Sequence, residues 1–172
     1  GPLVLGYMGT FTHDADLLMV LEALREVLRK RSGAVEFHLV GGIGQAGTLQ
    51  AFADLPLRIL SVQRRDAEYP RFVAWMIRHL HFDVGLAPLE DNGFTRCKSD
   101  LKFLDYAALG IPGIYSRVAP YEKSVRHLET GYLAENTAEA WRDGLERLLD
   151  DGALRQAMAA AAQQNVFSTR SL

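Results

Sequence analysis

Cysteine is almost absent from this sequence: Cys97 is the single one among 172 residues. One cysteine cannot form an internal disulfide, and no group of cysteine and histidine residues has the spacing of a zinc site. We therefore expect no disulfide framework, no bound metal and a reducing, cytoplasmic environment.

The sequence also has no long apolar run and no excess charge of either sign. No run approaches the roughly 18 apolar residues that identify a membrane-spanning helix, and no signal peptide is visible. The 19 lysines and arginines are balanced by 21 acidic residues, so the formal net charge is −2. Nucleic-acid-binding domains are characteristically basic. We therefore expect neither a transmembrane segment nor a nucleic-acid partner.

The residues that are present are typical of one globular domain. A chain of 172 residues, 48% of them apolar and 23% charged, can bury a core without disulfides or metal. The chain begins Gly-Pro rather than with methionine, which we interpret as the scar of a protease cleavage site. Residues 1–172 are accordingly expected to be a single domain excised from a longer protein.

Short apolar runs alternate with amphipathic segments along the chain. Strands that alternate with helices form parallel sheets covered on both faces. The expected fold class is therefore α/β: a Rossmann-like, doubly wound parallel sheet of about six strands with helices on both faces. We expect strands at 3–8, 35–40, 57–62, 82–86, 113–116 and about 131–133, and helices at about 17–30, 48–53, 70–80, between 99 and 110, at 121–127, and from 138 and 152 onward.

The stretch at 98–116 is the segment around which we expect a site to form. Ser99 is a candidate helix cap, Gly110 ends the helix, and Pro112 prevents its continuation. Apolar periodicity also assigns the inward-facing positions of this helix and of the helix at 70–80. They are Leu101, Leu104, Ala107 and Ala108 in the first, and Phe72, Val73, Met76, Ile77 and Leu80 in the second.

Lys98, Lys102 and Asp105 are four and three residues apart, which places them on one face at and just beyond a helix N-terminus. Backbone N–H groups, the positive end of the helix dipole and two lysines suit a diphosphate, and the carboxylate suits ribose hydroxyls. The pattern therefore predicts a nucleotide-sugar site. The alternative is a solvated helix face with an ordinary intrahelical ion pair.

In doubly wound folds ligands bind beyond the carboxyl ends of the strands. The loop after the first expected strand contains Gly9, Thr10, Thr12 and His13. The glycine permits close backbone approach, and the polar side chains stand before a helix, where a phosphate is favoured. Alternatively, Thr12 only caps the helix and His13 is a surface residue.

The loop at 88–96 carries two acids, Glu90 and Asp91, together with an amide and a cation. Carboxylates and amides form directional hydrogen bonds with sugar hydroxyls, so this composition suits a hydroxyl-rich ligand. Polar surface loops of the same composition are common, and the sugar interpretation therefore depends on the neighbouring helix.

Gly42, Gly44 and Gly47 form a literal G-x-G-x-x-G, the fingerprint of NAD-binding folds. The signal is weak, because it follows the second expected strand and precedes a short helix. In addition, Gln63 and two arginines follow the next strand, where NAD-binding folds have an acid for the ribose. The alternative is a loop that passes close to a ligand held mainly by other residues.

Four stretches carry a family resemblance: Gly6-Tyr7-Met8-Gly9, Gly85-Leu86-Ala87-Pro88-Leu89-Glu90, Lys102 through Pro112, and Thr130-Gly131-Tyr132-Leu133. Together they resemble the C-terminal, nucleotide-sugar-binding half of GT-B glycosyltransferases, and more narrowly the retaining group 1, or family-4, enzymes. The resemblance covers nearly the whole chain and is most specific at 102–116. It implies that Asp105, where Glu is more usual, contacts the nucleotide ribose.

The sequence departs from the family pattern at the acid that contacts the donor sugar. That acid stands seven intervening residues before the ribose-binding acid, and here the position is Cys97. The resemblance therefore implies that the role has moved to Glu90 or Asp91, or has been lost.

A second departure concerns the arginine and lysine that hold the donor diphosphate after the family's first strand, because Thr10 follows Gly9 here. Lys98 and Lys102 would compensate, with Thr10 and His13 completing the pocket. This arrangement resembles a divergent subgroup with a Gly-x-x-Thr-His loop and a Lys-Ser-x-x-Lys helix, found in large surface-polysaccharide or O-antigen enzymes.

The resemblance implies the donor-binding domain of a retaining glycosyltransferase that uses a UDP or GDP sugar and no metal or other cofactor. A glycan or similar acceptor would bind through an N-terminal domain outside this chain, so the isolated domain is expected to transfer nothing. The full-length enzyme would act in the cytoplasm, at most peripherally on the inner face of a membrane. The alternatives are half of a non-hydrolysing nucleotide-sugar epimerase, a non-catalytic nucleotide-sugar-binding module and an NAD-dependent enzyme. Candidate catalytic residues are Lys98, Lys102 and Glu90, and candidate nucleotide-sugar-binding residues are Gly9, Thr10, His13, Asp91, Ser99, Lys102 and Asp105.

Overall fold

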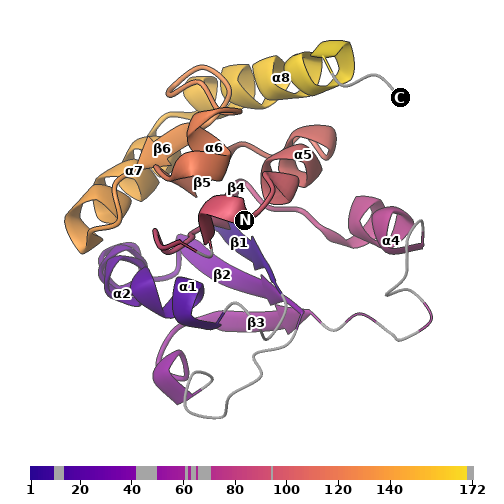
Figure 1. Cartoon of the computed structure of the whole chain (residues 1–172). Helices are drawn as coiled ribbons and strands as arrows, with labels where there is room; N and C mark the ends of the chain where they lie inside the picture. Colours follow the sequence, from indigo (N-terminus) through magenta and orange to yellow (C-terminus); the bar gives the residue numbers. More distant parts are fainter. Residues whose placement is uncertain are drawn as a thin grey trace.

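The computed structural model describes residues 1–9, 14–41, 50–60, 62, 65, 71–93 and 95–169. Within these residues, parallel strands form a 6-stranded sheet in the order β3-β2-β1-β4-β5-β6 (Figure 1). The predicted α/β fold class is therefore confirmed, with small boundary shifts in β3, β4 and β6. The strands are β1 (Leu3–Met8), β2 (Val35–Val40), β3 (Leu57–Leu60), β4 (Val84–Ala87), β5 (Gly113–Ser116) and β6 (Tyr132–Ala134).

The strand order reverses between β1 and β4. β1 pairs with β2 along its whole length and, on its other side, with β4 from Leu5 to Tyr7. The chain thus builds the sheet outward in one direction through β3 and then returns to continue it in the other. Such a switch point leaves a crevice at the carboxyl ends of the two central strands, where ligands of doubly wound folds bind.

The helices follow the predicted alternation, with two differences. The helix expected at 121–127 is instead a short helix at Ala119–Glu122 followed by a turn, and the helix expected at 48–53 lies partly outside the described residues. The other difference is near the N-terminus. The expected helix at 17–30 is interrupted at Val20, whose N–H bonds the Leu17 carbonyl at 3.2 Å in a turn. Val20 is itself buried, so the apolar spacing continues across the break and does not reveal it. The helices are α1 (Asp14–Met19), α2 (Leu21–Lys30), α4 (Arg71–His79), α5 (Leu101–Ala108), α6 (Ala119–Glu122), α7 (Ala138–Asp150) and α8 (Gly152–Thr169), with a 3₁₀ helix, η3 (Thr95–Cys97).

Helices cover both faces of the sheet, as expected. On one face α2 and α7 pack together over side chains such as Leu5 and Phe37, and on the other α5 and α8 pack over Tyr115 and Leu133 (Figure 1). Among the described residues, no helix combines the length and the apolar character that crossing a bilayer requires.

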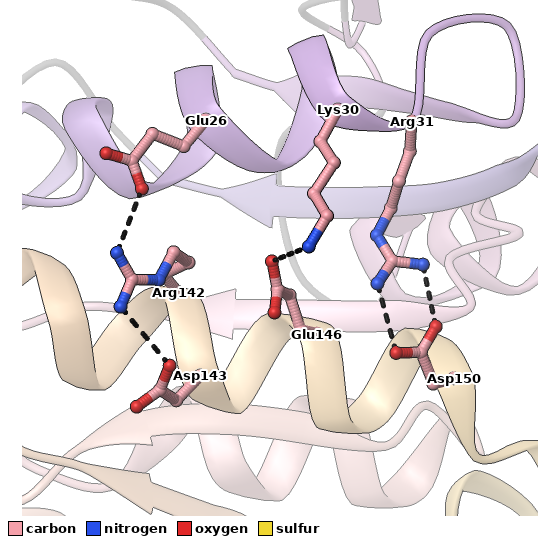
Figure 2. Close-up of polar contacts among 7 residues, drawn as sticks. All are labelled: Glu26, Lys30, Arg31, Arg142, Asp143, Glu146 and Asp150. Carbon is pink, nitrogen blue, oxygen red and sulfur yellow. Dashed lines mark hydrogen bonds and ion pairs between the residues drawn. The ribbon is translucent and has the colours of Figure 1, made fainter.

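An exposed ladder of ion pairs joins α2 to α7 (Figure 2). Its best-formed member is bidentate, with the Arg31 guanidinium 2.7 and 3.0 Å from the two oxygens of Asp150. The hydrogen bond from Arg31 lowers the pKa of the Asp150 carboxyl. Exposed pairs contribute little individually, so the ladder aligns two helices that the apolar core already holds together. Two other pairs cross between the helices, Lys30–Glu146 and Glu26–Arg142. Arg142 also pairs with Asp143 within α7.

The buried face of α5 differs only in part from the prediction, because Ala107 is buried and Leu104 packs against the core as expected. Phe103, Tyr106 and Ala107 are buried, whereas Leu101 is 52% exposed and Ala108 is also exposed. The aromatic side chains bury the larger area, and the periodicity of the leucines and alanines misplaced the face. The helix begins at Leu101 after Asp100, without a side-chain cap, so Ser99 is not the cap. Gly110 does end the helix, with a φ of 71°.

The inward face of α4 was also predicted incorrectly in part. Trp75 and Met76 are its buried residues, whereas Ile77 is 64% exposed. Trp75 stacks between Phe72 and His79, with ring centroids 6.2 and 4.8 Å away. Trp75 and Met76, rather than Ile77, therefore mark the side of α4 that faces the core.

Candidate functional site

A cavity of about 500 Å³ opens at the carboxyl ends of β1, β2 and β4. Its position is the switch point of the sheet, and its volume is within the range of small-molecule sites. Apolar residues make up most of its wall, and cationic side chains come from one side. The lining residues are Met8, Gly9, Val40, Gly41, Val62, Phe72, Pro88, Leu89, Lys98, Ser99, Leu101, Lys102, Asp105 and Tyr121.

Two glycines form the floor of the cavity. Gly9 follows β1 and donates its N–H to the Val40 carbonyl at 3.1 Å. Gly41 follows β2 with a φ of 97°, and a Cβ added there would collide with the Gly9 carbonyl oxygen. Both conditions require glycine at position 41. Directly after β1 and β2, the chain therefore presents bare backbone to the cavity at Gly9 and Gly41.

Lys98, Lys102 and Asp105 all line this cavity, so the structure brings together the three residues that the spacing predicted. Lys98 precedes α5 rather than belonging to it, and its N–H bonds the Thr95 carbonyl at 3.0 Å. Lys102 is half-buried, with Nζ 5.5 Å from the centre of the Tyr7 ring. Ser99 also lines the cavity, although its side chain is largely exposed.

Burial lowers the pKa of Lys102, and the positive charge of Lys98 lowers it further. The carboxylates of Asp16 and Asp105 oppose both effects and raise it. The two lysines therefore form a cationic wall whose repulsion is reduced by two acids. A partly desolvated cation next to a second one attracts a polyanion more strongly than either would in water.

Glu90 and Asp91 do not line the cavity, although Leu89 immediately before them does. Both side chains are exposed, and Asp91 lies 3.3 Å from the guanidinium of Arg96. The following turn is closed by Thr95, which exchanges hydrogen bonds with Asn92: the Thr95 N–H donates to Asn92 Oδ1 and the Asn92 N–H to Thr95 Oγ1, each at 2.9 Å. The two acids are thus placed next to the cavity but outside its wall.

Several predicted positions lie outside the described residues. They include Thr10, Thr12 and His13 of the first loop and the three glycines of the G-x-G-x-x-G stretch. Within the residues that are described, no group of histidine, cysteine and acidic side chains could hold a metal ion.

Sequence reasoning missed the polar side chains that hold the chain at the rim of the cavity. The Leu89 N–H donates to Ser116 Oγ at 2.8 Å, and the Leu89 carbonyl accepts from Asn136 Nδ2 at 2.8 Å. Ser116 Oγ in turn donates to Asn136 Oδ1 at 2.6 Å. The Glu90 N–H donates to Asp16 Oδ1 at 2.8 Å, although Asp16 is only 5% exposed. The available signal was Asp16, an acid directly before the apolar positions Leu17 and Leu18 of the first helix.

A family model described as glycosyl transferases group 1 matches residues 2–151 of the chain. No curated protein sequence matches it. Among solved structures, the C-terminal domain of the group 1 glycosyl transferase LpcC from Francisella tularensis is similar, with a TM-score of 0.74 and 18% identity over 99% of this chain and 87% of that one.

Two further similar structures are longer proteins solved with nucleotides. Anabaena Alr3699/HepE in complex with UDP-glucose has a TM-score of 0.73 and 13% identity, over 98% of this chain and 44% of that one. S. aureus TarM, in complex with Fondaparinux, alpha-GlcNAc-glycerol and UDP, has a TM-score of 0.73 and 14% identity, over 99% of this chain and 33% of that one. The chain thus spans less than half of either protein. At this level of identity, the similarity to both proteins is one of fold alone.

Proposed function

Because this chain belongs to the glycosyl transferases of group 1 and has the fold of their C-terminal domains, we propose that it binds the donor of a retaining sugar transfer. The donor would be a nucleoside-diphosphate sugar, and the acceptor a glycan or similar molecule. The observation that carries this proposal is the convergence of Lys98, Lys102 and Asp105 on one cavity at the switch point of the sheet.

The chemistry of the cavity wall suggests how the donor lies. The diphosphate would lie against Lys98 and Lys102, with the backbone at Gly9 and Gly41 allowing close approach. Asp105 would accept hydrogen bonds from the ribose hydroxyls, one helical turn after Lys102. The apolar part of the wall would take the base, because aromatic and aliphatic side chains pack against its flat face.

Sugar transfer leaves negative charge on the departing diphosphate. Lysines placed beforehand at that charge stabilise it as it develops, and a protein nucleophile is not needed in this scheme. Glu90 is the acid proposed to act at the sugar end, and Asp91 to contact the sugar, because both follow Leu89 at the rim of the cavity. Both acids would have to turn toward the donor from their exposed positions.

UDP is the nucleotide to test first, because two of the similar structures contain UDP or UDP-glucose. This chain would bind the donor without transferring it, since it corresponds to less than half of those proteins. The acceptor side would then come from a further domain. Synthesis of a surface polysaccharide is the proposed pathway, because the stretch from Lys98 to Lys102 resembles the Lys-Ser-x-x-Lys helix of enzymes of that kind.

The test is calorimetric titration of the domain with UDP, UDP-glucose, GDP and GDP-mannose. Lys102→Met keeps the apolar stem but removes the charge, and Asp105→Asn removes the other charge. Loss of one charge-assisted hydrogen bond should weaken binding roughly tenfold to a hundredfold. Lys30→Met is the matched control, because Lys30 is at the far end of α2 with 68% of its side chain exposed.

Saturable binding of one diphosphate, weakened by both site variants and unchanged by the control, would support the proposal. Binding that neither site variant weakens would place the nucleotide elsewhere. Absence of binding for all four nucleotides would contradict the proposal that this domain alone forms the donor site.

A further inference from the structure

Asp16 occupies an unusual position for a carboxylate. It lies on α1 with only 5% of its surface exposed, and it belongs to none of the predicted site positions. Burying a charged carboxylate is costly unless hydrogen bonds and opposite charge compensate for the lost hydration. The groups that compensate for the lost hydration of the Asp16 carboxylate therefore indicate the role of this residue.

Among the described residues, Asp16 acts on both the rim and the wall of the cavity. Its Oδ1 accepts the backbone N–H of Glu90 at 2.8 Å, which joins α1 to the chain leaving β4. Its charge also acts on two residues of the cavity wall, because it raises the pKa of Lys102 and that of Tyr121. A single buried carboxylate thus touches the rim of the cavity and influences its wall.

The rim is held from three directions at two consecutive residues. Ser116 at the end of β5 and Asn136 after β6 bind the two backbone groups of Leu89, and Asp16 binds the next N–H. Of these three side chains, Asp16 is the charged one. It alone can therefore couple the position of the rim to the electrostatics of the site.

We propose that Asp16 is a positioning residue of the donor site, which ties the Leu89–Glu90 rim of the cavity to α1. This inference rests on the proposed function for its nucleotide part, whereas its structural part does not depend on it. Asp16 itself would not contact the donor; it would act through the Glu90 backbone and through Lys102.

Two substitutions separate the two roles. Asp16→Asn keeps an oxygen acceptor for the Glu90 N–H but removes the charge, and Asp16→Ala removes both. Glu22→Gln is the matched control, because Glu22 is an exposed acid in the first turn of the next helix. Thermal unfolding of each variant shows whether it is folded. If Asp16→Ala does not fold, Asp16→Asn tests the tie, because its neutral oxygen is a weaker acceptor than the carboxylate and should give a smaller but measurable increase in exchange.

Hydrogen exchange at the Glu90 amide tests the tie to α1 without any ligand. Asp16→Ala should exchange this amide at least tenfold faster than the wild type, whereas Asp16→Asn and Glu22→Gln should retain most of the protection. An unchanged exchange rate in Asp16→Ala would overturn the positioning role. This readout stands even if the domain binds no nucleotide, so a failure of the proposed function is distinguished from a failure of the tie.

The pH dependence of UDP binding tests the effect on Lys102. Among the described residues, the charges that act on Lys102 come from Asp16 on α1, Asp105 on α5 and Lys98 in the segment before α5. The Lys102 ammonium itself lies over the ring of Tyr7 on β1. Without the Asp16 charge, Lys102 loses its proton at lower pH. As the pH is raised, binding by Asp16→Asn should therefore weaken at a lower pH than binding by the wild type or Glu22→Gln.

UDP titrates identically in every series, so the difference between series reports the protein. A UDP affinity that falls at a lower pH in Asp16→Asn than in Glu22→Gln would support the electrostatic role. Superimposable pH profiles for Asp16→Asn and Glu22→Gln would overturn the electrostatic role.

Discussion

Ser116→Ala is the perturbation whose consequence the structure predicts most directly. Ser116 is completely buried, accepts the Leu89 N–H at 2.8 Å and donates to Asn136 Oδ1 at 2.6 Å. Alanine fits the space but leaves the Leu89 N–H buried without its acceptor, which costs about 1–3 kcal/mol. Loss of the bond to Asn136 adds about 0.5–1.5 kcal/mol.

The expected total for Ser116→Ala is a loss of about 2–4 kcal/mol in the free energy of unfolding. For a domain of this size that corresponds to a decrease in Tm of roughly 5–15 °C. Urea unfolding followed by circular dichroism measures the loss, provided that the m-value is unchanged. Ser32→Ala is the matched control: Ser32 is exposed in the turn after α2, and its replacement should change stability by less than about 0.5 kcal/mol.

A double-mutant cycle measures whether Ser116 and Asn136 stabilise the rim as one network. Asn136 binds both Ser116 and the Leu89 carbonyl, so Ser116→Ala and Asn136→Ala act on one network. Their costs should fall short of additivity, with a coupling of roughly 0.5–3 kcal/mol. A loss for Ser116→Ala no larger than that of Ser32→Ala, or strict additivity in the cycle, would refute the idea that Ser116 holds the rim of the cavity.

Two further substitutions test the cavity floor and the edge of the sheet. Gly41→Ala should destabilise the domain by about 2 kcal/mol or more, because it combines a positive φ with a clash against the backbone of Gly9; Gly33→Ala, at a φ of 81° in open space, should cost only about 1 kcal/mol in the same urea assay. The Leu133 N–H donates to His127 Nδ1 at 3.0 Å, and burial lowers the pKa of this imidazole, so the folded state favours its neutral form. The unfolded chain then binds the proton more readily, and the stability contributed by His127 is present above its unfolded pKa of about 6.5 and is lost as pH falls below it. His127→Asn keeps an acceptor that does not titrate, so the urea midpoint should fall less between pH 7.5 and 5.5 than in the wild type; equal decreases in the two proteins, or a Gly41→Ala cost equal to that of Gly33→Ala, would contradict these assignments.

The sequence by itself determined the order of the elements and several residues that line the cavity. The strands at 3–8, 35–40 and 113–116 were predicted to the residue, because a buried strand of a parallel sheet is a short apolar run between turn residues. The spacing also sufficed to place Lys102 and Asp105 together, because they are one turn apart on α5. Lys98 precedes the helix, and the segment before α5 brings it to the same cavity.

Tertiary structure alone decided which side of each helix is buried and what holds the rim of the cavity. On α5, Tyr106 displaced the predicted leucine face because its hydroxyl donates to the Leu86 carbonyl at 2.7 Å, and at Gly85 an added Cβ would lie 2.8 Å from the Tyr106 ring. The Glu90 N–H and Asp16 are 74 positions apart in the chain. Periodicity reports on neighbours three or four residues away, whereas a hydrogen bond between distant segments exists only after the sheet has brought their ends together.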